Sequence, residues 1–269
     1  MTSPTAAPPA IVLRGAGLAE SGTPVLRPLD WTVRADERWV VLGPNGSGKT
    51  SLLRLVSFQR APSSGTVTVL GDTYGRVDVR AARRRIGLAS TALLQLLRPT
   101  LTARDAVVTG RDAALEPWWN TYDDDALARA AELLAFVGCE AHVDQEIGTL
   151  SEGERKRLLV ARLLMADPEL LLFDEPCAGL DLGGREALVA VLSELAFGTR
   201  PMVLVTHHLE EIPVGFTHAL LLRAGEVVAA GPLAETVTSL NVRETFRVDV
   251  DVFADGGRYA ARVTGLRPA

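Results

Sequence analysis

Continuous apolar runs that end in glycine or acidic residues alternate along the chain with helix-like segments. The stretch RWVVLG, residues 38–43, predicts a buried strand that runs into a loop. Two later runs, ELLLFDE at 169–175 and PMVLVTHH at 201–208, have the same character, and the helix-like stretch GREALVAVLSELAFG at 184–198 lies between them. Buried strands that alternate with helices predict a mostly parallel sheet in an α/β fold.

The same patterns divide the chain into segments. Residues 1–10, rich in proline and alanine, are predicted to form a loose tail. A single domain is expected over residues 11–240, beginning with short β-like runs separated by turns. Within it, residues 91–165 have helical spacing, clearest in DALARAAELLAFVG, and are interpreted as an inserted helical subdomain. The alternation in RVDVDVFADGGRYAARV predicts a terminal hairpin, so residues 241–269 are assigned to a β extension.

Composition narrows the class of protein. A length of 269 residues suits one large α/β domain, and a net charge of −5 gives no reason to expect a nucleic-acid partner. The N-terminus lacks the basic and apolar regions of a secretory signal. No apolar run approaches the roughly 20 residues of a membrane span. Two cysteines, Cys139 and Cys177, fit a reducing compartment. A role at a membrane would therefore need a membrane-embedded partner.

A phosphate-binding loop is predicted at GPNGSGKT, residues 43–50, which fits the pattern G-x-x-x-x-G-K-[ST] between a strand and a helix. Backbone N–H groups and the helix N-terminus would surround phosphate oxygens. Lys49 would reach the β and γ phosphates, and the Thr50 hydroxyl would bind Mg²⁺. The residues expected to contact the nucleotide here are Gly43, Pro44, Asn45, Gly46, Ser47, Gly48, Lys49, Thr50 and Ser51.

Two further strand ends carry groups suited to phosphate chemistry. Asp174 and Glu175 follow a buried strand, at the edge where open α/β sheets bind ligands. Asp174 is expected to hold Mg²⁺ and Glu175 to act as general base on the attacking water. His207 is expected to face the γ-phosphate. Adjacent histidines on a strand point to opposite faces, so His208 is interpreted as a bystander and the pair as a poor chelate.

At this point the sequence resembles the ATP-binding cassette (ABC) ATPases. The order GPNGSGKT, LSEGERKR, LLLFDEP, AGLD and VTHH is the order of that family's motifs, and the resemblance covers about Ile11 to Leu240. The resemblance implies a P-loop NTPase core with a mostly parallel sheet, an N-terminal antiparallel β subdomain and an inserted helical subdomain. It also implies ATP hydrolysis with ATP and Mg²⁺ as ligands.

The segment LSEGERKR, which starts at Leu150, resembles the family's signature motif. Ser151 is an N-cap candidate and Glu154 has capping-box spacing, while Gly153 would allow a ligand to approach the backbone. A helix start of this kind is an anion site. The resemblance implies that the anion is the γ-phosphate held by a second subunit, in a homodimer that encloses two ATP molecules. Asp181, in AGLD, would lie at that seam.

The sequence departs from the family pattern in two places. The glutamine that usually follows the strand RIGLAS is missing at Ser90 and Thr91, and Gln95 lies a few residues on, so either Thr91 or Gln95 could take its part. The aromatic residue that usually stacks on adenine is also missing, and Glu20 lies near its expected place. With the flanking motifs, these departures resemble a subgroup of molybdate- or iron-type transport ATPases.

Two functions are compatible with these motifs. The first is an ATPase subunit that powers a membrane permease, with a substrate-binding protein as a possible further partner. Such a subunit would be cytoplasmic and peripheral on the inner face of the membrane. The alternative is a soluble ABC ATPase of an assembly or repair machine, such as iron–sulfur cluster assembly. Trp118 and Trp119 lie in the helical region and could either pack internally or dock a partner.

Overall fold

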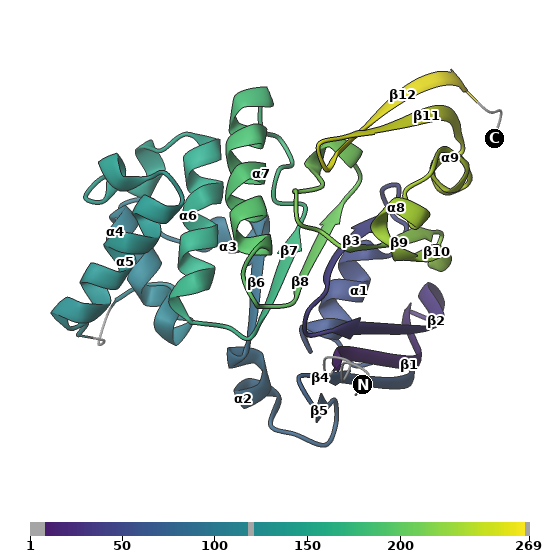
Figure 1. Cartoon of the computed structure of the whole chain (residues 1–269). Coiled ribbons are helices and arrows are strands. Elements are labelled where there is room, and N and C mark those ends of the chain that lie inside the picture. Colours follow the sequence, from purple (N-terminus) through teal and green to yellow (C-terminus); the bar gives the residue numbers. More distant parts are fainter. Residues whose placement is uncertain (1–8, 118–120, 267–269) are drawn as a thin grey trace, which may run out of the picture.

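The computed structural model describes residues 9–117 and 121–266. Within these residues the largest sheet has six strands, in the order β10-β9-β3-β8-β7-β6 (Figure 1). Strands β9, β3, β8, β7 and β6 are parallel, and only β10 runs antiparallel to its neighbour. In sheet order the strands are Glu226–Pro232, His218–Arg223, Arg38–Leu42, Met202–Thr206, Leu170–Asp174 and Ile86–Ser90.

Both faces of the five parallel strands are largely buried, which explains why these strands are continuously apolar, whereas the edge strand β10 is largely exposed. Side chains of alternate residues point to opposite faces. In β3, Val40 and Leu42 belong to one apolar core, while Trp39 and Val41 belong to a second core. The first core packs beneath helices α6 (Glu152–Met165) and α7 (Leu182–Ala196), and the second beneath helix α1 (Lys49–Val56).

A smaller antiparallel sheet covers the second core. Its strands have the order β2-β1-β4-β5, with bounds Thr23–Arg34, Pro9–Glu20, Ser64–Val69 and Asp72–Thr73. Helix α2 (Val79–Arg84) leads from this sheet into β6. Pro9 of β1 pairs with Arg34 of β2, so residues 9 and 10 of the predicted tail belong to a strand, and residues 1–8 lie outside the described residues.

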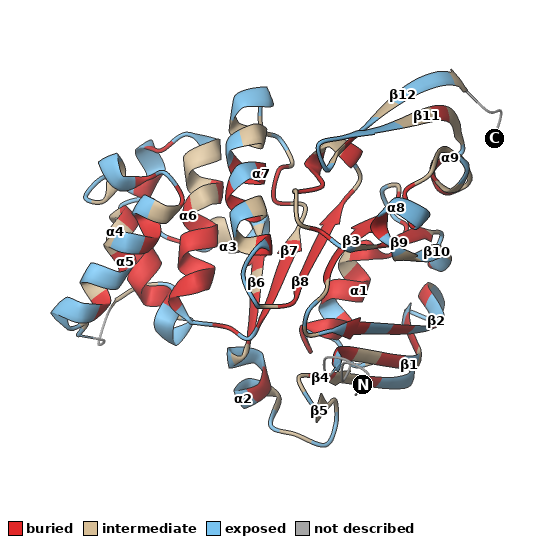
Figure 2. Ribbon diagram, viewed as in Figure 1, coloured by how far each residue is buried: buried red, intermediate tan, exposed pale blue. Residues whose placement is uncertain are grey.

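The helical region lies on the other side of the molecule from β1 and β2 (Figure 1). The burial colours show one buried and one exposed face on α5, and a largely buried α6 (Figure 2). This amphipathic pattern is the one that helical spacing predicts. Besides α6, the helical region contains α3 (Thr91–Leu94), α4 (Ala103–Val108), η1 (Thr109–Asp112), α5 (Asp124–Phe136), η2 (Glu140–His142) and η3 (Ile147–Thr149).

The C-terminal part follows the short turn η4 (Leu209–Glu211) and strands β9 and β10. It consists of α8 (Leu233–Thr236), α9 (Ser239–Phe246) and the hairpin β11 (Val248–Asp255) with β12 (Arg258–Leu266). The hairpin was expected, but the boundary at residue 241 falls inside α9, so the extension begins as a helix. Figure 1 shows the hairpin reaching back from α9 toward β8 and α7.

These elements confirm the predicted α/β fold class, with its mostly parallel sheet, N-terminal antiparallel sheet and inserted helices. Across the ranges that the structure describes, no helix combines the length and apolarity needed to cross a bilayer. Trp118 and Trp119 lie outside the described residues, so their two interpretations stay open.

Candidate functional site: a nucleotide-binding half-site and a capped helix

The loop at residues 43–50 connects β3 to α1, and two of its glycines are required by geometry. A Cβ atom on Gly43 would lie 2.2 Å from the carbonyl oxygen of Leu222. Gly48 has a φ of 102°, in the left-handed region, and as the N-cap of α1 it has no side chain to cap the helix. The first N–H groups of α1 are thus left for another acceptor. Of the remaining predicted contacts, Asn45 and Gly46 are exposed, Pro44 and Thr50 are half-buried, and Ser47, Lys49 and Ser51 are buried.

Lys49 holds a buried positive charge at the centre of the loop. Its side chain is 4% exposed, and Nζ donates to the carbonyl oxygens of Gly43 at 2.8 Å and Pro44 at 3.0 Å. Burial lowers the pKa of Lys49, and the nearby carboxylate of Glu175, 3.6 Å from Nζ, partly opposes that shift. An anion placed here would meet an ammonium group that has little water around it.

Thr50 and Asp174 meet across the loop, as the sequence predicted for a shared metal. The Thr50 hydroxyl donates to Asp174 Oδ1 at 3.1 Å. Asp174 lies at the end of β7, in register with Ser90 of β6 and Val205 of β8, so the strand ends converge at one edge of the sheet. Burial raises the pKa of Asp174, and the bond from Thr50 partly offsets this shift. Hydroxyl and carboxylate oxygens are the ligands that Mg²⁺ prefers.

Glu175 and His207 face each other at the same edge. Glu175 has a φ of 47°, a left-handed conformation that is unusual for a residue other than glycine and typical of functional sites. Its Oε1 lies 3.4 Å from His207 Nδ1, and among the described residues that nitrogen is buried without a hydrogen-bond partner. The predicted orientation of the histidine pair is wrong, because β8 ends at Thr206 and the rings of His207 and His208 lie 4.1 Å apart.

A cavity of about 300 Å³ opens beside Asp174 and Glu175. Its lining indicates which residue could take the place of the family's missing glutamine. Thr91 lines the cavity together with Thr50 and Asp174, whereas Gln95 is the exposed C-cap of α3 and is not part of its lining. Gln59 also lines the cavity and was not among the residues predicted from the sequence. No local pattern marks Gln59, because it reaches the cavity only through the length of α1 and the turn that follows.

The start of α6 has the predicted capping box. Glu154 N donates to Ser151 Oγ at 3.3 Å, and Ser151 N donates to Glu154 Oε2 at 2.7 Å. The bonds to Ser151 lower the pKa of Glu154. His142 Nε2 lies 3.1 Å from Glu154 Oε1 and holds this carboxylate from the other side. The helix start is therefore fixed in place, with Ser151 exposed.

The residues of this helix start form a second hollow with the loop before α7. Asp181 caps α7 by accepting from Gly184 N at 2.7 Å, and Gly153 lies against Gly184. The hollow has a volume of about 470 Å³, and Ser151, Gly153 and Asp181 line it. As far as the described chain shows, it shares no lining residue with the cavity beside Asp174. The structure thus divides the predicted site residues into two groups.

Neither Glu20 nor Trp39, the two positions considered from the sequence, offers an aromatic ring on which adenine could stack. Glu20 is exposed at the end of β1. Trp39 was considered as a substitute, but it is buried at the start of β3, at the end remote from the P-loop. Its ring stacks on His218, with centroids 4.8 Å apart, and packs edge-on against Trp31 at 5.5 Å.

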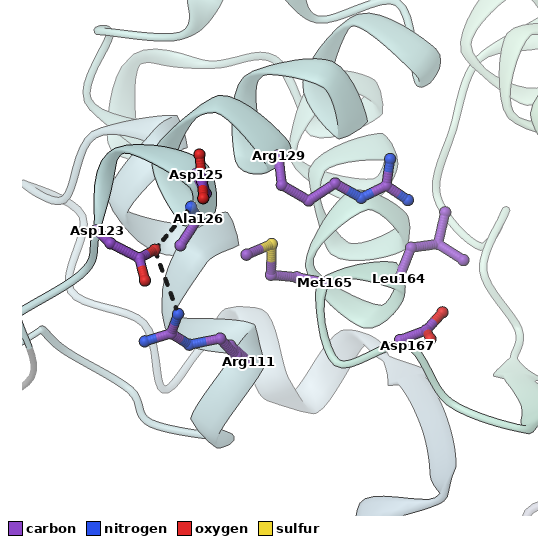
Figure 3. Close-up of a pocket in the computed structure, with 8 residues that line it drawn as sticks. All are labelled: Arg111, Asp123, Asp125, Ala126, Arg129, Leu164, Met165 and Asp167. Atoms are coloured by element: carbon purple, nitrogen blue, oxygen red, sulfur yellow. Dashed lines mark hydrogen bonds and ion pairs between the residues drawn. The ribbon is translucent and has the colours of Figure 1, made fainter.

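A further hollow of about 500 Å³ lies in the helical region (Figure 3). Its charged side chains serve local structure. Asp123 caps α5 by accepting from Ala126 N at 2.9 Å, and it lies 3.6 Å from Arg111. Asp167 pairs with Arg200. We therefore assign no nucleotide chemistry to this hollow.

Comparison with known proteins agrees with the motif order. A sequence model of the family described as ABC transporter matches residues 26–178. The chain is 38% identical over 243 residues to the uncharacterized ABC transporter ATP-binding protein YlmA of Bacillus subtilis, covering 89% of this chain and 92% of that protein. It is 35% identical over 240 residues to the nickel import ATP-binding protein NikO of Rhodobacter capsulatus, covering 85% and 91%. These relatives do not support the molybdate- or iron-type subgroup that the sequence suggested.

Solved structures show the same fold. The chain superposes on cbiO1 of Clostridium perfringens, part of the ABC transporter complex cbiONQ, with a TM-score of 0.75 and 23% identity, covering 88% of this chain and 94% of that one. A post-hydrolysis dimer of the ATP-binding cassette MJ0796, bound to ADP and Pi, gives a TM-score of 0.71 at 24% identity, covering 83% and 98%. The motifs, the fold and these relatives agree, and the chain belongs to the ABC transporter family as one of its ATP-binding proteins, an ATPase.

Proposed function

We propose that this ATPase powers transport through a membrane permease, and that it works as a homodimer with two composite ATP sites. The observation that carries the proposal is the division of the site residues into two hollows. One is lined by Thr50, Asp174 and Glu175, and Glu175 lies beside Lys49 and His207. The other is lined by Ser151 and Asp181. Each hollow offers half of what ATP hydrolysis needs, and a second copy would supply the other half.

The first hollow fits a nucleotide triphosphate with Mg²⁺. Ser47 Oγ and His207 Nδ1 are both buried and have no hydrogen-bond partner in the described chain, so phosphate oxygens or an attacking water would satisfy them. Asp174 and Thr50 would hold Mg²⁺, which would neutralise charge on the β and γ phosphates. Glu175 would accept a proton from the attacking water, and Lys49 would stabilise the phosphate charge.

The second hollow would contact the γ-phosphate of an ATP molecule that is bound by the P-loop of the other copy. Ser151 begins a capped helix, and Gly153 leaves room for close approach to the backbone N–H groups. Asp181 is exposed beside it. Together these features support contact in trans across a dimer. The similar cassette MJ0796 was solved as a dimer with ADP and Pi, which is compatible with such an arrangement.

A groove between the core and the helical region supports a docking site for the permease. It has a volume of about 580 Å³, and Gln59 and Leu88 line both this groove and the nucleotide cavity. Arg83 and Arg84 stand exposed at its edge, on the helix that precedes β6. The apolar part of the groove consists of Ile86, Leu88, Leu93, Leu159 and Leu163. A short helix with apolar and acidic side chains, from a cytoplasmic loop of the permease, would match it.

The experiment that tests this proposal is to examine the neighbouring genes for a polytopic membrane protein and to co-express the chain with such a protein. The wild-type chain should be recovered with membranes. Changing Arg83→Glu together with Arg84→Glu should release it, because acidic side chains would then face acidic side chains. Arg14→Glu, an exposed change on β1, is the matched control and should leave binding intact. Recovery of the wild-type chain in the soluble fraction would contradict the proposal and favour an assembly or repair machine.

The names of two relatives support import as the direction of transport. NikO and the phosphonates import protein PhnC of Anaeromyxobacter dehalogenans, which is 39% identical over 232 residues, are both named as import ATP-binding proteins. We therefore extend the proposal to import, with a substrate-binding protein as a further partner. The ATPase would be cytoplasmic and would lie on the inner face of the membrane through the permease.

A further inference from the structure

The C-terminal hairpin is bonded to the two segments that follow predicted site residues. One segment is η4, which begins two residues after His207. The other is the N-terminal part of α7, the helix that follows Asp181 and includes Glu186. Strand β12 contacts both segments through side-chain and backbone hydrogen bonds. The hairpin is thus part of the framework of the site, although it lies at the end of the sequence.

Arg258 makes the central contacts. Its guanidinium group donates to both carboxylate oxygens of Glu186, at 2.9 Å and 3.1 Å, in a bidentate pair. The same group donates to the carbonyl oxygen of Glu210 at 2.8 Å. A planar guanidinium is suited to bridging two acceptors in fixed directions, because its N–H groups have a rigid geometry. This bond to Arg258 lowers the pKa of Glu186.

The η4 turn is held from both sides. Glu210 Oε1 accepts from the backbone N–H of Ala261 at 3.2 Å. The buried Glu211 side chain accepts from the hydroxyl of Thr206, and the same hydroxyl accepts from His208 N at 3.1 Å. The backbone around His207 is therefore fixed by β8 on one side and by the hairpin on the other.

The hairpin can act as a support because it is itself anchored at its other end. Val250 is 1% exposed and belongs to the main apolar core. Arg243 of α9 donates to the carbonyl oxygen of Val250 at 2.8 Å and lies 2.7 Å from Asp251. Tyr259, next to Arg258, is also buried in this core. A side chain presented from such a base moves little relative to the sheet.

We propose that Arg258 is a positioning residue for ATP hydrolysis, because it connects the turn that follows His207 to the helix that Asp181 caps. The inference rests on the proposed function, because in the dimer His207 serves its own ATP site and Asp181 lies at the seam with the partner. Through Arg258, a shift at the seam would be transmitted to the histidine of the neighbouring site.

The first test is Arg258→Ala in the full chain, measured by steady-state ATP hydrolysis and by calorimetry of ATP binding. We expect kcat to fall by about 10- to 10²-fold, since small misplacements of catalytic groups have effects of this size. ATP affinity should stay within about twofold, because the hydrogen bonds of Arg258 go to Glu186 and Glu210 and not to the P-loop. Arg262→Ala is the matched control and should leave kcat unchanged. Arg262 lies on the same strand but is exposed, and it packs over the ring of Phe253.

Two further variants separate positioning from general stability. Arg258→Lys keeps the charge beside Glu186 but not the bidentate geometry, so it should recover part of the lost kcat. Glu186→Ala should lower kcat as Arg258→Ala does, and the double variant should be no worse than either single one, because both remove the same contact. If Arg258→Ala fails to fold, Glu186→Ala tests the tie from its other end.

The outcomes distinguish this inference from the proposed function. Unchanged kcat in Arg258→Ala, with a wild-type enzyme that hydrolyses ATP, would overturn the positioning role and leave the ATPase assignment standing. Multiplicative losses in the double variant would also overturn it. If Glu175→Gln hydrolyses ATP as fast as the wild type, the proposed catalytic site itself is wrong.

Discussion

Glu175 Oε1 lies 3.4 Å from His207 Nδ1, although the two residues come from the ends of different strands. The fold thus places the expected base and the expected γ-phosphate contact side by side. An attacking water placed between them would meet a carboxylate that can accept its proton and an imidazole that can orient it. This arrangement leads to a direct test of the role of each hollow.

Changing Glu175→Gln should leave ATP binding intact and slow hydrolysis by roughly 10²–10⁴-fold, the usual contribution of a general base. The amide keeps the shape of the carboxylate but cannot accept the proton. ATP-bound dimers should then accumulate, and sedimentation in the presence of ATP and Mg²⁺ should show them. A species that remains monomeric at high protein concentration would contradict the composite site.

Changing Lys49→Ala should abolish tight ATP binding, because the phosphates would lose the buried ammonium group at the centre of the loop. Calorimetry measures the loss. Lys49 also donates to Gly43 and Pro44, so a melting curve should accompany the experiment to show that the loop's framework is intact. Unchanged affinity for ATP would falsify the assignment of the P-loop.

Changing Ser151→Arg should prevent the ATP-dependent dimer without weakening ATP binding by the monomer, because the bulky cation would fill the second hollow. Sedimentation and calorimetry measure the two properties separately. Ser151→Ala is the control for the cap alone and should cost about 0.5–2 kcal/mol of stability. An equal loss of monomer binding in Ser151→Arg would show that the signature helix does not act in trans.

Base selection should be weak, with ATP and GTP binding within roughly tenfold of one another. Glu20 is exposed and Trp39 is buried in the core, so neither gives the adenine a stacking surface, which is worth about 0.5–1.5 kcal/mol beyond burial. A competition titration with both nucleotides decides the matter. Preference for ATP by more than about 100-fold would mean that another side chain reads the base.

The sequence predicted site residues that belong to local motifs better than site residues that only the tertiary structure brings together. The P-loop, the Asp174–Glu175 pair and the capping box of Ser151 follow from local patterns, because each depends on neighbours within a few residues. The orientation of His207 and His208 was mispredicted because β8 ends at Thr206, two residues before the end of the strand expected at 201–208.

Other features depend on contacts between distant segments. Gln59 reaches the nucleotide cavity through the length of α1, and Arg258 reaches Glu186 across 72 residues of sequence. The sequence pattern did not indicate the helix α9 at residue 241, because α9 has few apolar residues and packs against β11 and β9. Such contacts have no periodicity that a single sequence could display.

Strand β3 joins the two apolar cores, since Val40 and Leu42 pack on one side and Trp39 and Val41 on the other. Strands β7, β8 and β9 also contribute to both cores, so the antiparallel sheet and the helical layer are linked through the whole parallel sheet, and β3 is the strand that leads into the P-loop. Unfolding of either apolar core would also remove packing from the strands that the two cores share. The chain should accordingly melt as one cooperative unit, and a ligand held at the P-loop should raise the melting temperature of the whole molecule rather than of one half.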